Sequence, residues 1–204
     1  MRLPPITQAL LIANVAVFLL QSAVGASLII WFALWPPLPS GPVIAPSFQI
    51  WQLVSYAFLH GSLGHLFFNM LALYMFGSEV ERLFGPRFYI QYYFASVVTA
   101  ALTHLVVSSW AGGPPVPTVG ASGGIYGLLL AYGIYFPRRT VMLLFPPIPM
   151  PARVFVTLFA ALELWFGVTG TLSGVAHFAH LGGMLGGFLM IQYRRGQFPF
   201  ARRR

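Results

Sequence analysis

The sequence predicts an all-α integral membrane protein in which six transmembrane helices form one bundle, and three observations support this fold class. The chain of 204 residues is 58% hydrophobic and only 7% charged, whereas about a quarter of the residues in a typical soluble domain are charged. Six apolar segments are long enough to cross a bilayer. The arginines lie on alternate connections between these segments, as expected when they stay on the cytoplasmic side of a membrane.

The composition excludes several classes of protein. Cysteine is absent, which excludes disulfides, iron–sulfur clusters and thiolate metal sites. The net charge of +8 comes from arginines scattered singly and in pairs between apolar segments. Membrane topology explains this charge better than nucleic-acid binding, so we expect no nucleic-acid partner. The length predicts a single domain over residues 1–204, and the long first apolar stretch is expected to be a span rather than a cleaved signal peptide.

The six predicted spans are separated by connections rich in proline and glycine. They run approximately over 7–32, 52–76, 88–108, 120–136, 150–168 and 175–193. A span needs about 20 residues, with a range of about 17–25, so the fourth is at the short end. The separating stretches include "WPPLPSGPVIAPS", "AGGPPVPT" and "FPPIPMP", which interrupt helices because of their prolines and glycines.

The arginine positions predict the orientation of the spans. Arginine occurs before the first span, after every second span, and nowhere in the other three connections. The positions are Arg2, Arg82, Arg87, Arg138, Arg139, Arg153, Arg194, Arg195, Arg202, Arg203 and Arg204. Because basic residues stay on the cytoplasmic side, we expect both termini to be cytoplasmic.

Several polar residues lie within the predicted spans, where they are costly and therefore indicate function. They are His60, His65, Asn69, Ser122, Glu163, His177 and His180. Counting the helical rise from the inner charged ends places three of them, His65, Ser122 and His180, about 21–24 Å above the inner interface. Three spans that run in the same direction thus bring polar groups to one level, several Å below the outer surface.

Helical spacing places these groups on shared faces. His65 and Asn69 are four residues apart, as are Ser122 and Tyr126, so each pair lies on one face. Stripes of small residues on the fourth and sixth spans allow close backbone approach, which would bring His180 towards Ser122. These packing residues are Gly120, Gly123, Gly127, Gly183 and Gly187.

Ser122, in the segment "GASGG", has an ordinary explanation when it is taken alone. Serine and other small residues are common where membrane helices touch. The match to G-x-S-x-G is weak, because the hydrolase elbow follows a strand and needs a later acidic partner. Here a Pro/Gly loop precedes the serine and aspartate is absent, which excludes a soluble α/β-hydrolase.

The other polar residues also have structural interpretations. Hydrogen bonds between helices would account for His65 and Asn69, and packing near the outer end of the last span would account for His177. We interpret Glu163 as a structural hydrogen-bonding residue, with polarisation of a histidine as the alternative. No carboxylate pattern accompanies the histidines, so we expect no metal. The histidines considered as ligands are His60, His65, His177 and His180.

Taken together, the same residues indicate a catalytic site more strongly than each does alone. A serine, a histidine and two further donors at one depth supply a nucleophile, a base and oxyanion donors. Four motifs that contain them resemble those of rhomboid intramembrane serine proteases. They are "HGSLGHLFFN", "GSEVERLFG", "GASGGIYG" and "AHLGGMLGG". The motifs occur in the family's order, and the resemblance spans roughly residues 51–192.

The resemblance implies a Ser–His dyad without an acid, in which Ser122 is the nucleophile and His180 is the general base. It implies that His65, Asn69 and the backbone N–H of Ser122 bind the oxyanion. Tyr126 would pack against His180. No cofactor is implied.

The resemblance also implies supporting roles and a setting. His60 would be a supporting hydrogen-bonding residue, and Glu81 would brace the cytoplasmic side. The expected substrates are single-span membrane proteins in the lipid bilayer, cut near small residues. The form that the chain resembles is the minimal six-span one, and we expect it in a bacterial or archaeal plasma membrane.

Two alternatives remain open at this point, and the identity of the base needs an argument. The alternatives are an inactive rhomboid-like binder of membrane proteins and a small channel or transporter. The segment "AHFAH" offers both His177 and His180 as bases. His177 lies about 4.5 Å nearer the outer surface, whereas His180 matches Ser122 in depth, so we predict His180.

Overall fold

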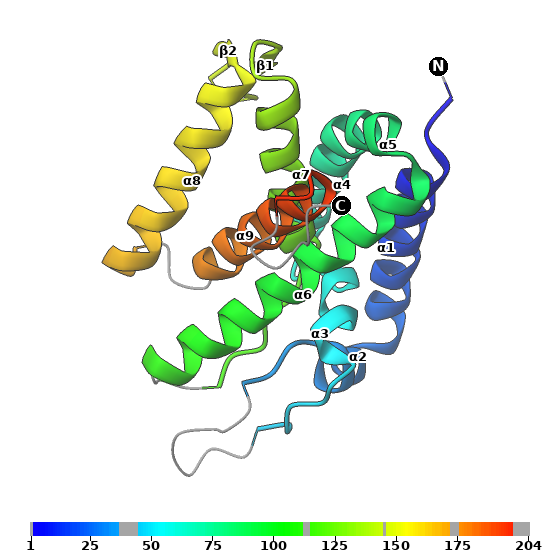
Figure 1. Cartoon of the computed structure of the whole chain (residues 1–204). Helices are drawn as coiled ribbons and strands as arrows, with labels where there is room; N and C mark the ends of the chain where they lie inside the picture. The colour runs from blue at the N-terminus through cyan, green and yellow to red at the C-terminus, as the bar shows by residue number, and fades with distance from the viewer. Residues whose placement is uncertain (1, 37–44, 112–114, 145, 172–175, 198–204) are drawn as a thin grey trace.

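The structure is a computed structural model that describes residues 2–36, 45–111, 115–144, 146–171 and 176–197. Helices make up most of it and pack as one bundle, with a short two-stranded hairpin at one end (Figure 1). The elements are α1 Pro5–Val24, α2 Ala26–Phe32, α3 Gln52–Ser55, η1 Tyr56–Phe58, α4 Leu63–Ala72, η2 Leu73–Gly77, α5 Ser78–Phe84, α6 Pro86–Ala111, α7 Ser122–Tyr135, β1 Thr140–Met142, β2 Pro149–Pro151, α8 Ala152–Thr169 and α9 His177–Arg194. The prediction of a predominantly helical bundle is confirmed, and the hairpin is an addition to it.

Three of the described helices are long and apolar enough to cross a membrane. They are α1, the part of α6 over Pro86–Trp110, and α8. The predicted span 120–136 becomes α7, whose 14 residues correspond to about 21 Å of helical rise. The predicted span 175–193 becomes α9. Four of its 18 residues are glycines, which contribute less hydrophobicity than larger apolar side chains. The start of that span at Val175, and Arg202, Arg203 and Arg204, lie outside the described residues.

Two predicted spans are not single helices. The span 7–32 breaks at Gly25, whose φ of 74° ends α1 before the short α2 begins. The span 52–76 contains α3 and the 3₁₀ turn η1, then a non-helical stretch, because α4 starts only at Leu63. Ser62 caps α4 by accepting a hydrogen bond from the His65 N–H (3.1 Å), which fixes the start of that helix. Apolar composition alone did not reveal this break.

The helical run that starts at Leu63 extends beyond the predicted limit. It passes through the π-helical turn η2 into α5 and ends at Phe84. Gly85 then terminates it with a φ of 76°, and its N–H donates to the carbonyl of Glu81 (2.8 Å). A positive φ of this size favours glycine, so the glycine sets the end of the run.

Helix α9 lies at the centre of the bundle, between α6 on one side and α7 and α8 on the other (Figure 1). The glycines of α9 face α6 and α7. A Cβ on Gly186 would lie 2.7 Å from Thr99 Oγ1 of α6, and one on Gly187 would lie 3.2 Å from Gly127 Cα of α7. The core around this helix also contains fully buried aromatic side chains, which are Tyr56, Tyr89, Tyr92 and Tyr93.

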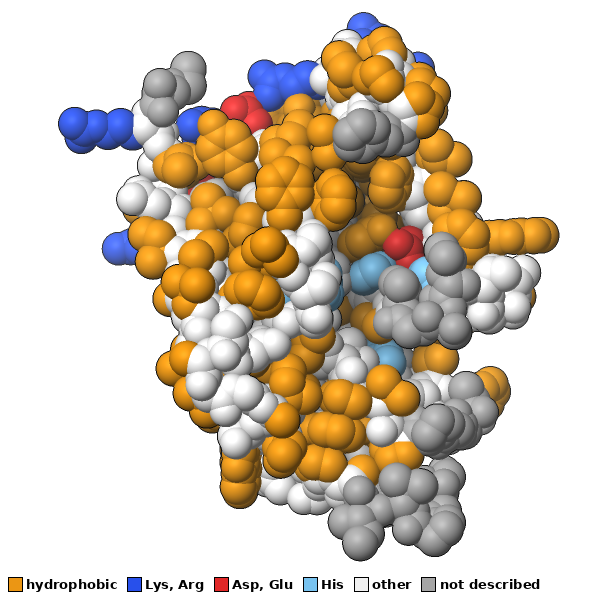
Figure 2. Space-filling view, turned by 180° about the vertical axis from the view of Figure 1, so that it is seen from behind, with side chains coloured by type: hydrophobic (Ala, Val, Ile, Leu, Met, Phe, Trp, Pro, Cys, Tyr) orange, Lys and Arg blue, Asp and Glu red, His pale blue; other side chains and the backbone are white. Residues whose placement is uncertain are grey.

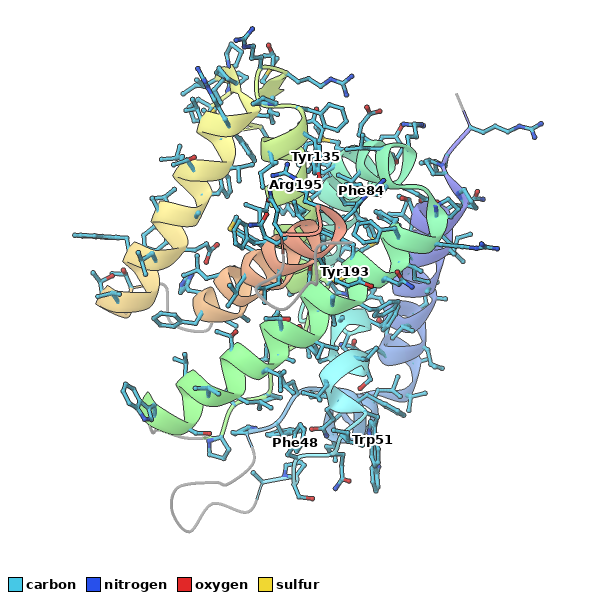
Figure 3. All side chains as sticks on the ribbon, in the orientation of Figure 1. Phe48, Trp51, Phe84, Tyr135, Tyr193 and Arg195 are labelled. Atoms are coloured by element: carbon cyan, nitrogen blue, oxygen red, sulfur yellow. The ribbon has the colours of Figure 1, made fainter. Side chains whose placement is uncertain are left out.

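The surface is apolar around the bundle and basic at one end. Figure 2 shows hydrophobic side chains over most of one face, with the arginine side chains gathered towards the top. Figure 3 shows Phe48 and Trp51 at the opposite end of the bundle from Tyr135 and Arg195. The Arg195 guanidinium lies over the Tyr135 ring, 5.4 Å from its centroid. Aromatic residues at both ends of an apolar band are typical of membrane–water interfaces.

Glu81 joins two helices at the basic end. Its Oε1 accepts from the Ile6 N–H (2.9 Å), and its Oε2 accepts from the N–H and hydroxyl of Thr7 (2.6 and 2.7 Å). The N–H groups in the first turn of a helix have no partner within that helix, so the carboxylate satisfies two of them in α1. The side chain therefore lies where the predicted brace would act.

Candidate active site

The loop before α7 places Ser122 at the first position of that helix. Gly120 has a φ of 126°, and a Cβ on it would lie 2.8 Å from the His65 ring. Its N–H donates to the carbonyl of Tyr56 (3.0 Å), which fastens the loop to η1. A residue with a side chain would be strained and would collide here, so the glycine allows the serine to lie beside α4.

Ser122 and His180 are brought together as the sequence predicts. His180 Nε2 lies 2.8 Å from Ser122 Oγ, a hydrogen-bond distance. The glycine stripes of α7 and α9 make this approach possible, because a Cβ on Gly183 would overlap the carbonyl oxygen of Gly123. The predicted close contact between the two helices is therefore present in the fold.

Tyr126 lies flat against His180, one turn along α7 from the serine. The two rings are stacked, with centroids 4.3 Å apart and planes 6° apart. The Tyr126 hydroxyl donates to Oε1 of Glu163, which comes from α8. The tyrosine thus restricts the histidine ring on one side and contacts a carboxylate on the other.

Glu163 contacts both histidines of α9, although the sequence favoured a structural hydrogen-bonding role. Its Oε2 lies 2.7 Å from His177 Nδ1 and 3.0 Å from His180 Nδ1. The first contact is a hydrogen bond, whereas the second has an ion-pair distance without being a hydrogen bond. All three side chains are buried. An acidic group therefore lies beside the pair, where the family resemblance implied none.

Two further donors from α4 face the same region. Asn69 is buried, and its Nδ2 has no hydrogen-bond partner among the described residues. The His65 ring lies against Gly120, and its Nδ1 accepts a long hydrogen bond from the Gly61 N–H (3.5 Å). A neutral imidazole with an acceptor at Nδ1 carries its proton on Nε2, so both residues can offer an N–H.

These groups line one cavity of about 580 Å³. Figure 2 shows histidine atoms in a hollow of the apolar surface, next to an acidic group. The polar lining residues are His65, Asn69, His104, Thr118, Ser122 and His180, together with Tyr56. His104 has no functional signal in the sequence, and its Nε2 forms a hydrogen bond with the Thr118 hydroxyl (2.8 Å).

His60 does not use its side chain as predicted. Its backbone N–H donates to Gln21 Oε1 (3.2 Å) and its carbonyl accepts from Gln21 Nε2 (2.7 Å). Within the described part of the chain its ring nitrogens have no hydrogen-bond partner. The buried ring instead packs edge-on against His65, with centroids 5.1 Å apart. The His60 ring therefore contacts the site by packing, while Gln21 of α1 holds its backbone.

The structure groups a different set of metal-ligating residues from the four histidines considered above. Glu163, His177 and His180 have ligand atoms within 4.8 Å of one another. The spacings of 2.7 and 3.0 Å between carboxylate and imidazole atoms are hydrogen-bond distances. Ligands at about 2.0–2.2 Å from a tetrahedral zinc ion would be roughly 3.3–3.6 Å apart. The observed arrangement thus fits a proton-sharing cluster better than a metal site.

Comparison with known proteins identifies one family. The family model described as "Rhomboid domain" matches residues 47–197. Rhomboid protease GlpG of Klebsiella pneumoniae is 30% identical over 198 residues, which are 91% of this chain and 62% of that protein. Rhomboid protease GluP of Bacillus subtilis is 32% identical over 140 residues, or 68% of this chain and 25% of that protein.

A mitochondrial relative extends the similarity beyond bacteria. RHOMBOID-like protein 12, mitochondrial, of Arabidopsis thaliana is 29% identical over 166 residues, which are 74% of this chain and 49% of that protein. The chain thus spans from a quarter to about three fifths of the length of these curated relatives. The matched region contains the serine, both α4 donors and the histidine. On the strength of the domain match, the chain belongs to the rhomboid family.

Proposed function

We propose that the protein is an intramembrane serine endopeptidase that cuts transmembrane segments of membrane proteins with a pair formed by Ser122 and His180. The observation that carries the proposal is the 2.8 Å separation between His180 Nε2 and Ser122 Oγ, two residues that line one cavity. The relatives named rhomboid protease support it. A serine hydroxyl is a weak nucleophile until a neighbouring base takes its proton, and this histidine is within reach to do so.

The reaction would proceed in two steps. Ser122 Oγ bonds to the carbonyl carbon of the scissile peptide while His180 Nε2 takes the hydroxyl proton. His180 then gives that proton to the leaving amine as the C–N bond breaks, which leaves an acyl ester on the serine. In the second step a water molecule attacks the ester with His180 as base. The carboxylic acid product leaves and the serine regains its proton.

The donors from α4 would stabilise the negative oxygen formed in each step. Asn69 Nδ2 is buried and unpaired among the described residues, so it can donate without first losing another partner. His65 and Ser122 line the same cavity, and His65 Nε2–H and the Ser122 backbone N–H would be the other two donors. Fixed donors of this kind are each worth about 10²–10³ in rate, because they need no reorganisation during the reaction.

We further propose six spans, formed by α1, the α4–η2–α5 run, α6, α7, α8 and α9. The arginine-bearing end would face the cytoplasm, which places both ends of the chain on that side. Helix α7 would rise about 21 Å from the inner interface. In a hydrocarbon core of about 30 Å, Ser122 would then lie below the outer surface, and its cavity would open to water on that side.

The substrate would be the transmembrane segment of a single-span protein in a bacterial or archaeal plasma membrane. A second cavity of about 450 Å³ adjoins the first and shares Ser122 and Asn69 with it. Its lining is largely apolar and includes Phe68, Leu129 and Phe155, which suits a hydrophobic peptide. The segment must unwind near the cut, because a helical backbone hides its carbonyl groups in hydrogen bonds.

The central experiment compares the wild-type protein with Ser122→Ala in proteoliposomes that contain a labelled single-span substrate. We expect cleavage and fluorophosphonate labelling in the wild type and neither in the variant. Cleavage by Ser122→Ala would overturn the proposal. Binding without cleavage by both proteins would indicate an inactive binder, and ion flux that persists in Ser122→Ala would indicate a channel.

A separate labelling experiment tests the proposed orientation. Ser109→Cys lies in the last turn of α6, at the end expected outside, and Arg139→Cys lies on a connection expected in the cytoplasm. An impermeant thiol reagent added to intact cells should modify the first and not the second. Modification of Arg139→Cys from outside would contradict the six-span arrangement with cytoplasmic ends.

A further inference from the structure

We infer that Glu163 is a positioning residue for His180, so that the site works as a Ser–His–Glu triad rather than as a dyad. The inference rests on the proposed function and deepens it. Glu163 would hold the ring of the base in one orientation and offset the positive charge that forms on it during the reaction. The carboxylate comes from α8, a different helix from those that carry the serine and the histidine.

The two ring nitrogens of His180 face different partners. Nε2 lies 2.8 Å from Ser122 Oγ, and Nδ1 lies 3.0 Å from Glu163 Oε2. Nε2 can accept the serine proton only when the neutral ring carries its own proton on Nδ1. A carboxylate oxygen next to Nδ1 favours that tautomer, because its negative charge attracts the Nδ1–H and repels the lone pair of the alternative. The contact has an ion-pair distance without hydrogen-bond geometry, and catalytic contacts of this kind are often poorly aligned before substrate binds.

The carboxylate itself is held in place by groups that also restrain the histidine. The Tyr126 hydroxyl donates to Oε1 of Glu163, and the Tyr126 ring stacks on His180. The three side chains therefore form a closed set in which each touches the other two. Glu163 is only 8% exposed, so its charge would act on a neighbouring imidazolium through a medium of low dielectric constant.

His177 provides the competing explanation. Its Nδ1 lies 2.7 Å from the same oxygen, Oε2, that lies near His180 Nδ1. If Glu163 served only to join α8 to α9 through His177, loss of either partner would have the same consequence. If Glu163 positions His180, only the change at Glu163 would impair the chemical step. The two explanations therefore predict different results for substitutions at these two positions.

The first part of the test measures kcat and KM for Glu163→Gln in detergent with the labelled single-span substrate. Glutamine keeps the size of the side chain and removes its charge. We expect kcat to fall about 10²–10⁴-fold with KM and the melting temperature unchanged, since replacing the acid of a serine–histidine–acid triad by its amide costs up to about 10⁴ in another protease. Glu163→Asp should recover part of the lost kcat. It restores the negative charge, although its shorter side chain leaves the carboxylate slightly farther from His180.

His177→Asn is the matched control, since it removes the competing imidazole from the same carboxylate. It should keep kcat within about threefold of the wild type. Glu79→Gln is a second control, because Glu79 is a half-buried partner of Arg82 and Arg139 at the basic end. A kcat loss in His177→Asn equal to that in Glu163→Gln would overturn the inference and assign Glu163 to the α8–α9 contact.

A spectroscopic measurement keeps the inference testable where folding is affected. The proton on His180 Nδ1 should give a strongly downfield ¹H resonance in the wild type, in Ser122→Ala and in His177→Asn. The resonance should be lost in Glu163→Gln and in His180→Ala. Its persistence in folded Glu163→Gln would refute the contact with the carboxylate.

Two further outcomes separate this inference from other failures. Loss of wild-type activity on treatment with a chelator, with recovery on adding zinc alone, would make the Glu163, His177 and His180 cluster a metal site and overturn the triad. Cleavage that survives Ser122→Ala would overturn the proposed function itself. A Ser122-dependent protease that is indifferent to Glu163→Gln would instead retain the proposed function as a dyad and overturn only the inference.

Discussion

Helices α8 and α9 are equally long but are held in the bundle in different ways. Each has 18 residues, yet nine are buried in α9 and four in α8. Five of the buried α9 residues are glycine or alanine, which allow backbone contact with α6 and α7. In α8 the outer half is largely exposed, as Trp165 (64%) and Val168 (72%) show, and Glu163 is its only buried residue.

Because of this difference, the two helices hold their functional side chains in different ways. Backbone contact on both sides leaves α9 little room to rotate, so His180 keeps its distance from Ser122. The inner half of α8 packs through Phe155, whose ring centroid lies 6.0 Å from that of Phe76 in η2. In the outer half, the one buried side chain is that of Glu163, and it is held by hydrogen bonds from Tyr126 and His177. The base is thus fixed by backbone packing, whereas the acid is fixed by hydrogen bonds. Each of the following predictions tests one side of this comparison.

The largest effect is expected where α9 meets α7. Gly183→Ala should lower the free energy of unfolding by more than the about 1–3 kcal/mol of ordinary overpacking, because the new Cβ would overlap the backbone of Gly123. Substrate cleavage should be lost as well. The matched control is Gly167→Ala on α8, where the Cβ would meet the Phe178 side chain at 3.0 Å and that ring can move. Equal melting temperatures for the two variants would contradict the rigid contact.

The next largest effect concerns the two histidines of α9. His180→Ala should reduce kcat by about 10⁴-fold or more, because no base would then lie beside the serine, and the residual rate would come from the oxyanion donors and binding. His177→Ala should retain much of the activity, since its ring contacts Glu163 rather than Ser122. Fluorophosphonate labelling provides an independent measure of serine reactivity. The reverse pattern would transfer the role of base to His177.

A smaller effect is expected for the α4 donor. Asn69→Ala should lower kcat by about 10²–10³-fold, or about 2.7–4 kcal/mol of transition-state stabilisation, and leave the melting temperature and part of the Ser122 labelling intact. Asn14→Ala is the control, because Asn14 is also buried but bonds the carbonyl of Leu10 within α1 (2.8 Å). Unchanged turnover in Asn69→Ala would make this asparagine a packing residue.

The smallest effect is expected at the basic end, away from both helices of the comparison. Glu81→Gln weakens hydrogen bonds to the first turn of α1, and charge-assisted bonds of this kind contribute about 1.5–3 kcal/mol each. The melting temperature in detergent should fall while kcat stays close to that of the wild type. A selective loss of kcat would show that Glu81 influences the reaction rather than only the attachment of α1.

The sequence predicted the pairing of Ser122 with His180 because its causes are local. The glycine spacing in "GASGGIYG" and "AHLGGMLGG" fixes which faces approach each other, and counting the rise fixes the depth. The position of Glu163 could not be predicted in the same way. Large apolar side chains of α8 lie both on its buried face, such as Phe155, and on its exposed face, such as Trp165, so its apolar pattern does not indicate which face meets the bundle. The side of the helix that faces His180 emerges only when α8 packs against its neighbours.

Two features of the fold also depend on information that composition does not carry. The stretch between η1 and α4 is only four residues long, over 59–62, and lies inside an otherwise apolar predicted span. The capping hydrogen bond of Ser62 marks where α4 begins. The hairpin of β1 and β2 contains several prolines, which indicate a loop rather than a strand. Its antiparallel pairing of Val141 with Met150 follows from the way α7 and α8 bring the two segments together.

The position of Ser122 at the start of α7 has an electrostatic consequence. The amino end of a helix carries the equivalent of about half a positive charge, and α4, α7 and α9 all begin next to the cavity. Their combined field would favour the oxyanion of the reaction. The same field opposes the positive charge that must form on His180 at the same moment. Glu163 supplies negative charge on the far side of that ring, so the acid of α8 would let one cavity accommodate both signs of charge.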